Sequence, residues 1–164
     1  MRAKKITSMA MLTAAALIIF IVELQIPSPV SIPGVKPGLA NIVTVYAMFA
    51  MDPISALMIL LCRVALGCML SGQAMSFIYS IAGGFLAYLS MLFMRRLVTE
   101  KQIWVCSAVA AVFHNIGQII AAVFITGTAS VAAYLPVLII SGVITGVFTG
   151  LSAQFVVKRI GKKF

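Results

Sequence analysis

Three polar side chains stand within five residues of an otherwise apolar segment: His114, Asn115 and Gln118. Residues four apart share one face of a helix, so His114 and Gln118 project together with Asn115 beside them. Inside a membrane such groups face protein or a cavity, because exposing them to lipid is costly. We interpret the group as one wall of a ligand site. The alternative is hydrogen bonding that holds two helices together.

One arginine, Arg63, is the eleventh residue of the apolar stretch 53–70, close to its middle. Insertion scales put the penalty for arginine at the bilayer centre at about 2.5–3.5 kcal/mol. Since a guanidinium keeps its charge, it needs an anionic or carbonyl partner. We interpret Arg63 as a ligand for a carboxylate, phosphate or carbonyl group of a bound solute. The alternative is a structural ion pair with Glu23.

A third candidate feature is the segment 34–38, in which glycines flank Lys36 just before Asn41. Such a segment at a helix N-terminus can present backbone N–H groups to an anion. Together these features give the predicted substrate-binding residues Arg63, His114, Asn115, Gln118, Asn41, Lys36 and Glu23.

Catalytic patterns are missing from the sequence. It has no phosphate-binding G-x-x-x-x-G-K-[ST] motif and only three acidic residues, whereas a prenyl-diphosphate synthase needs clustered carboxylates to hold Mg²⁺. The three cysteines lack the spacing of a zinc site. We therefore expect no enzymatic activity, no catalytic residues, no metal and no cofactor.

The elements that position these residues follow from composition and charge. Of the 164 residues 63% are hydrophobic and 9% charged, which excludes a soluble enzyme, a disordered regulator and a nucleic-acid-binding module. The net charge of +9 comes mainly from basic clusters at 2–5, 95–101 and 158–163. Such clusters mark the cytoplasmic ends of membrane spans.

The hydrophobic pattern predicts an all-α integral membrane protein, one domain over 1–164 with six transmembrane helices and both termini in the cytoplasm. A helix through the 32 apolar residues 39–70 would be about 48 Å long, too long for one crossing, so we divide it at Asp52-Pro53, a helix-start pair. With six spans, ten basic residues lie inside and Lys36 alone lies outside. The predicted spans are 6–26, 37–51, 53–70, 74–94, 103–125 and 136–157.

Three further features concern processing, the outside loop and helix contacts. The first span is expected to be retained, because no signal-peptide cleavage site follows it. The proline-rich segment 27–37 is either a lid over a cavity or a plain connector. Small residues repeat every fourth position at Gly142, Gly146 and Gly150, which we expect to pack within the chain, and at Ala10 and Ala14, which could dock a partner helix.

The motifs together resemble the Gx transporter family, which is also labelled heptaprenyl diphosphate synthase component I. The resemblance covers nearly the whole chain. It is carried by the run PGVKPGLAN at 33–41, Arg63, Ser80 with Gly83-Gly84, and the run HNIGQ at 114–118. That family is in turn similar to the S components of energy-coupling-factor (ECF) importers, six-span subunits that bind the substrate.

The resemblance implies an outward-facing solute site beneath the first loop. It also implies partners, a transmembrane T component that contacts Ala10 and Ala14, and two ATPase subunits, in the bilayer of a bacterial cytoplasmic membrane. An alternative from a different class is a non-transporting accessory subunit for isoprenoid or quinone synthesis, or for flavin-based extracellular electron transfer. A self-sufficient transporter is a third candidate. No nucleic-acid partner is expected.

Overall fold

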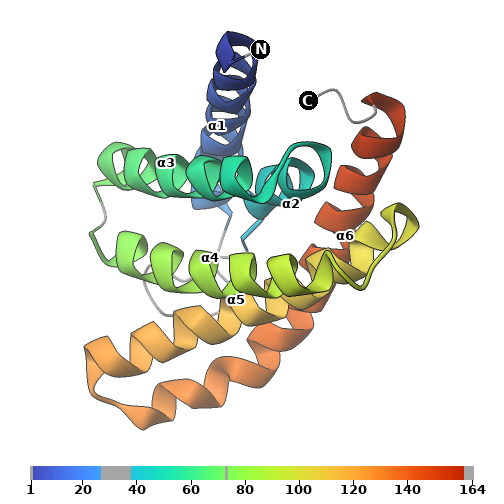
Figure 1. Cartoon of the computed structure of the whole chain (residues 1–164). Coiled ribbons are helices and arrows are strands. Elements are labelled where there is room, and N and C mark those ends of the chain that lie inside the picture. Colours follow the sequence, from blue (N-terminus) through green and yellow to red (C-terminus); the bar gives the residue numbers. More distant parts are fainter. Residues whose placement is uncertain (1, 27–37, 73, 161–164) are drawn as a thin grey trace.

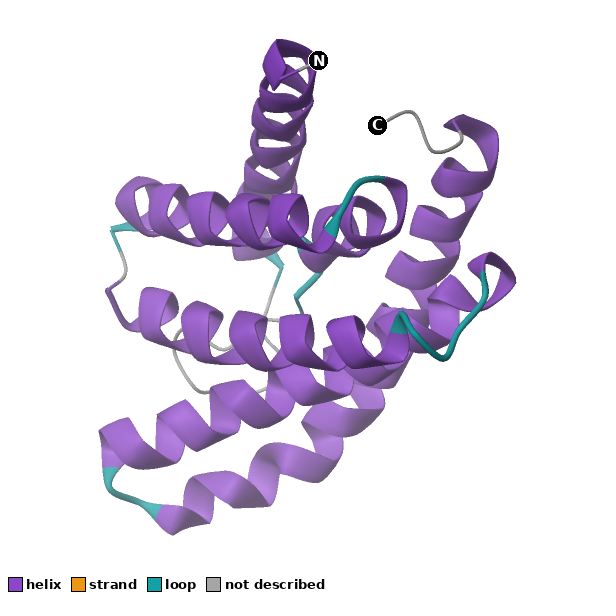
Figure 2. Cartoon of the chain, viewed as in Figure 1, coloured by secondary structure: helices purple, strands orange, loops and turns teal. Residues whose placement is uncertain are grey.

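The computed structural model describes residues 2–26, 38–72 and 74–160, and in this part every regular element is a helix (Figure 2). This confirms the predicted all-α class. Two short 3-10 turns, η1 (Glu100–Gln102) and η2 (Ala129–Tyr134), precede α5 and α6. The α-helices are α1 (Arg2–Gln25), α2 (Asn41–Ala50), α3 (Pro53–Ser71), α4 (Ala74–Met94), α5 (Ile103–Thr126) and α6 (Leu135–Ile160).

The long apolar stretch divides at Asp52, as predicted. Asp52 has an extended backbone, its carboxylate accepts the backbone N–H of Ser55 at 3.3 Å, and Pro53 is the first helical residue. At the other end α3 stops at Gly72, whose φ of +63° is in the left-handed region that favours glycine. The predicted second span starts earlier than the helix: α2 begins at Asn41 after a turn.

Five helices, α1, α3, α4, α5 and α6, are long and apolar enough to cross a membrane. With 10 residues α2 spans only about 15 Å, half the thickness of the hydrocarbon core. The number of crossings and the cytoplasmic orientation therefore stay predictions. In Figure 1 the start of α1 lies at the top, the end of α6 at the upper right and the α4–α5 connection at the right, whereas the α5–α6 connection lies at the lower left.

The helices form two groups of three. In the C-terminal group α4 and α6 both pack along α5. This packing uses the small face of α6: a Cβ on Gly150 would lie 2.5 Å from Cα of Trp104, so glycine lets the two backbones approach closely. In the N-terminal group α1 packs on α3 and α2. Helix α2 also packs against α6 of the C-terminal group (Figure 1).

Two apolar clusters form the core. The larger one gathers residues of all six helices, including Met48, Ile59 and Met91, and the smaller one joins α4, α5 and α6 around Tyr79 and Leu138. Along α5, His114 and Gln118 lie between Ala110 of the first cluster and Ala122 of the second. A buried polar layer thus separates two apolar regions.

Large apolar side chains cover the outer surface. On α6 alone Ile140, Ile144 and Phe148 are each about two-thirds exposed, at 64%, 66% and 66%. A soluble protein rarely shows so extended an apolar face. With five helices of membrane-spanning length, this surface identifies a multi-pass membrane protein.

Candidate functional site

The polar layer begins at the turn before α2, where Glu23 meets the backbone. The carboxylate of Glu23, on α1, accepts the N–H of Gly38, and the N–H of Leu39 at 3.0 Å. The first N–H groups of a helix have no intrahelical partner, so a carboxylate stabilises them. Gly38 adopts a φ of +80°, which a residue with a side chain rarely does. The N–H groups of Gly38 and Leu39 are therefore bound by an acid of the same chain, whereas the rest of the predicted anion site, 34–37, lies outside the described residues.

Arg63 lies beside this turn and is 5% exposed. Its Nη2 donates to Oδ1 of Asn41 at 3.2 Å, which links α3 to the first residue of α2. Glu23 is near enough to act on Arg63 electrostatically, but the two side chains form no ion pair within 4.0 Å. Ligand contact and structural pairing with Glu23 therefore both stay predictions for Arg63.

His114 connects the turn to the opposite side of the bundle. Its ring lies against Gly38, where a Cβ would be 3.3 Å from Nε2, and also against Gly83 of α4, where a Cβ would be 2.9 Å from Nδ1. Both contacts need glycine, because a side chain at either position would displace the imidazole. His114 is 3% exposed and is fully enclosed by α2, α4 and α5.

Gln118 and Asn115 extend the layer toward α4 and α6. Gln118 is 1% exposed, packs on Gly83, and its Oε1 has no hydrogen-bond partner among the described residues. Asn115 points the other way and donates its Nδ2 to the carbonyl of Leu138 in α6. Glu23, Asn41, Arg63 and His114 are thus brought together, whereas the amide nitrogen of Asn115 holds two helices.

Two other predictions concern residues away from this layer. Ala10 and Ala14 are both exposed on α1, as a surface for a partner helix requires. Lys36 and the segment 27–37 lie outside the described residues. Their predicted roles, as a ligand contact and as a lid or connector, stay predictions.

A small cavity adjoins Arg63 on its other side, between α1, α3 and α4. Its volume is about 10 Å³, the space that one water molecule needs. Its lining combines Arg63 with two serines of α4, two phenylalanines, a cysteine and a valine. These residues are Phe20, Arg63, Val64, Cys68, Ser76, Phe77 and Ser80.

Apart from Arg63, these cavity residues were not among the site residues predicted from the sequence. Ser76 and Ser80 are four apart, so their shared face with Gly83-Gly84 was readable in the sequence. Cys68 and Phe20 carry no such pattern, since apolar and thiol side chains are common in any span. Within the described part of the chain, no three His, Cys, Asp or Glu residues gather as a metal site would require.

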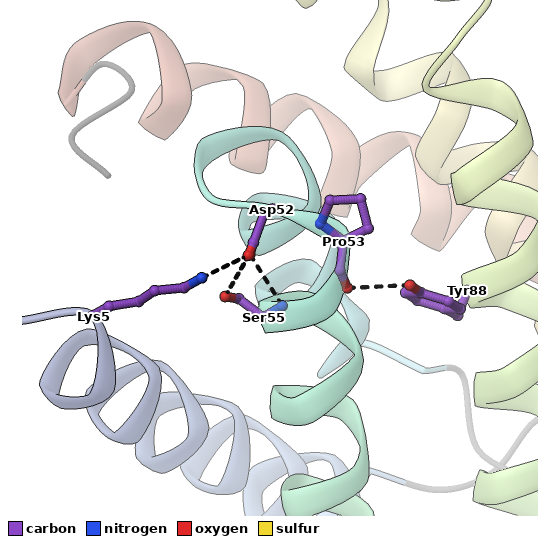
Figure 3. Close-up of polar contacts among 5 residues, drawn as sticks. All are labelled: Lys5, Asp52, Pro53, Ser55 and Tyr88. Carbon is purple, nitrogen blue, oxygen red and sulfur yellow. Dashed lines mark hydrogen bonds and ion pairs between the residues drawn. The ribbon is translucent and has the colours of Figure 1, made fainter. Parts of the chain in front are cut away.

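A separate polar contact holds the N-terminal end of α1 (Figure 3). Nζ of Lys5 pairs with Oδ1 of Asp52 at 2.9 Å, and Oγ of Ser55 donates to the same carboxylate at 2.8 Å. Nearby the hydroxyl of Tyr88 donates to the carbonyl of Pro53 at 3.2 Å. The start of α3 is therefore tied to both α1 and α4.

Burial alone would raise the pKa of Asp52. The hydrogen bonds from Lys5 and Ser55 outweigh this effect, so the pKa lies below its ordinary value of 3.8. Asp52 is consequently ionised at neutral pH and its contact with Lys5 is a true ion pair.

Comparison with known proteins gives a family and no individual relative. Neither the search of curated proteins nor that of solved structures found a match. The family described as heptaprenyl diphosphate synthase component I matches residues 12–156, a range that contains the residues of the polar layer and of the cavity but not Ala10. The chain, a multi-pass membrane protein with a buried polar layer, belongs to the heptaprenyl diphosphate synthase component I family.

Proposed function

We propose that this chain is the membrane-embedded solute-binding subunit of an ECF-type importer, in which separate subunits hydrolyse ATP. The observation that carries the proposal is the meeting of Arg63, Asn41 and His114, from three helices, in one buried layer. A charged and incompletely hydrogen-bonded group in the middle of a membrane protein is costly. A bound solute that supplies the missing partner gives such an arrangement a function.

In this proposal Arg63 pairs with the negative or carbonyl group of the solute. Asn41, His114 and Gln118 supply hydrogen bonds, and Gln118 offers the unpartnered acceptor Oε1. Glu23 holds the start of α2 in place through Gly38 and Leu39. Asn115 and Lys36 are secondary candidates for solute contacts. The solute arrives from the outer side, and no step in its binding requires a covalent bond.

The partners proposed are a transmembrane T component and two ATPase subunits. The face of α1 that carries Ala10 and Ala14 is exposed and has small side chains, so another helix can approach its backbone closely. Ala10→Trp should abolish co-purification of these partners while leaving solute binding intact. Ile144→Trp on α6, at a position 66% exposed, is the matched control and should retain them.

The deciding experiment is purification of the tagged chain from its native membrane in a mild detergent. Mass spectrometry would identify both co-purified proteins and any retained small molecule. Co-purified T component and ATPases are expected. Once the retained molecule is identified, Arg63→Ala and His114→Ala should each weaken its binding at least tenfold, as loss of a hydrogen bond to a charged group does. Full affinity in both variants would refute the site.

The family description favours a second function, a membrane component that assists a prenyl-diphosphate synthase. In that case the polar layer holds the helices together and binds no solute. The same purification separates the two: a soluble synthase subunit in place of the ATPases would support this assignment.

A further inference from the structure

The two buried charges near the turn before α2 are not equivalent. Glu23, 2% exposed, is already matched by the N–H groups of Gly38 and Leu39 at a helix start. Its negative charge is therefore committed to the fold, and the site offers no acidic group to a cationic ligand. Arg63 instead has one hydrogen bond among the described residues, to the neutral amide of Asn41, and is attracted by Glu23 without a hydrogen bond between them.

Arg63 has more N–H donors than it has hydrogen bonds among the described residues. A guanidinium carries five N–H groups, and Nε of Arg63 is buried without a hydrogen-bond partner among the described residues. A buried charge whose only hydrogen bond goes to a neutral amide is incompletely compensated, even with an acid of the same chain nearby. A group that completes the hydrogen bonding of Arg63 must be a hydrogen-bond acceptor. A negatively charged acceptor also compensates the positive charge of the guanidinium.

The cavity beside Arg63 places further donors where such a group would lie. Ser76 and Ser80 come from successive turns of α4 and line the same cavity as the guanidinium. Phe20 and Phe77 form its apolar wall. The lining thus combines donors that suit an anion with aromatic residues that suit an apolar or aromatic body.

Charge balance selects the kind of anion. One arginine compensates one negative charge, whereas a phosphate monoester carries about −1.5 to −2 at neutral pH. The excess charge of a phosphate would stay buried without compensation. A carboxylate matches the planar fork of arginine and carries a single charge.

We infer that the cavity between α3 and α4 is the anion subsite of the solute site, and that it takes the carboxylate of a small organic monoanion. Arg63 binds the carboxylate, Ser76 and Ser80 donate to its oxygens, and the two phenylalanines contact the body of the molecule. This inference rests on the proposed function for its physiological meaning and adds the chemical class of the solute. At about 10 Å³ the cavity must widen to admit it, so α3 and α4 separate when the acid binds.

Cys68 provides a reporter for the test, because its thiol lines the same cavity. In a Cys62→Ser, Cys106→Ser chain purified in detergent, N-ethylmaleimide reacts with Cys68 alone, and mass spectrometry gives the rate. Four probes are compared: acetate and benzoate, and their neutral analogues acetamide and benzamide. The two acids are expected to slow labelling at least threefold and the two amides to leave it unchanged. Phenyl phosphate should protect less than benzoate.

Variants assign the effect to residues. Arg63→Gln should remove the protection by the acids, and Ser80→Ala, a milder change that preserves the fold, should raise the acid concentration needed about tenfold. Ser90→Ala, on the same helix but outside the cavity, is the matched control and should leave protection unchanged. Equal protection by acids and amides, protection that survives Arg63→Gln and Ser80→Ala, or no protection by either acid would each overturn the inference.

Two more outcomes separate related explanations. Protection in bilayers containing phosphatidylserine, but not by acetate or benzoate, would assign the carboxylate to a lipid headgroup and overturn the solute inference. Arg63-dependent protection without any co-purified T component would support the subsite and count against the importer. Co-purified T component and ATPases without Arg63-dependent protection would do the reverse.

Discussion

Replacing Gly83 by alanine tests whether α4 and α5 pack as described around His114. A Cβ at Gly83 would lie 2.7 Å from the backbone carbonyl oxygen of His114, whereas ordinary contact begins at 3.4 Å. The helices would therefore have to separate by about 0.7 Å, because backbone cannot rotate away as a side chain can. Overpacking of this kind typically costs about 1–3 kcal/mol.

The neighbouring glycine provides a matched control. A Cβ at Gly84 would meet only the end of the Leu60 side chain, at 3.0 Å, and that end can turn aside. Both substitutions gain the same helix-forming advantage of alanine, roughly 0.5–1 kcal/mol, so this term cancels when they are compared. The difference between Gly83→Ala and Gly84→Ala isolates the contact with His114, about 1–3 kcal/mol.

The assay is thermal unfolding in detergent, followed by the fluorescence of Trp104, the one tryptophan of the chain. For a chain of this length a free-energy difference of 1–3 kcal/mol corresponds to a Tm difference of about 2–12 °C. Gly84→Ala should match or slightly exceed the Tm of the parent chain. A Gly83→Ala chain as stable as Gly84→Ala would refute the packing of α4 on α5 and the placement of His114.

Three further predictions concern contacts outside the cavity. Asp52→Ala should lower the free energy of unfolding by about 0.5–2 kcal/mol, because α3 loses its N-cap. Asp52→Asn keeps a good cap and should lose only the ion pair with Lys5, about 0.2–1 kcal/mol, and unfolding curves of the two variants measure the difference. Because the pKa of Asp52 is lowered, its stabilising effect should be complete above about pH 5 and be lost as pH falls through that lowered pKa, and a Tm series in acid should show the loss in the parent chain but not in Asp52→Asn. Asn115→Ala removes the contact with Leu138 and should cost about 0.6–1.7 kcal/mol in unfolding measurements.

Local patterns explain why most of the fold was predictable. Asp52-Pro53 marks a helix start through groups within four residues of each other, so the division between α2 and α3 required no long-range information. Long apolar runs likewise set the bounds of α3, α4 and α5 to within one residue of the prediction. The start of α2 was less predictable, since the preceding turn depends on a carboxylate 15 residues earlier.

The site was only partly predictable, because its contacts also join residues that are far apart in the sequence. Polar residues in apolar spans identify Arg63, His114 and Gln118 as costly, but not which groups they meet. The sequence left Glu23 as a candidate partner of Arg63, and the structure places its carboxylate on the backbone of Gly38 and Leu39 instead. Tertiary packing decides which donors reach the carboxylate of Glu23, and no spacing along the chain indicates it.

The attachment of α1 at both ends has a mechanical consequence. Lys5 fixes its first turns to Asp52, and Glu23, 18 residues and about 27 Å further along, fixes its last turn to the start of α2. Helix α1 is therefore held at both ends against the unit formed by α2 and α3. A force applied to its outer face is therefore transmitted to Arg63, while Ser76, Ser80 and His114 belong to the other three helices. A tilt of α1 would move α2 and α3 relative to α4, α5 and α6. The residues of the polar layer, which come from both groups of helices, would then shift past one another.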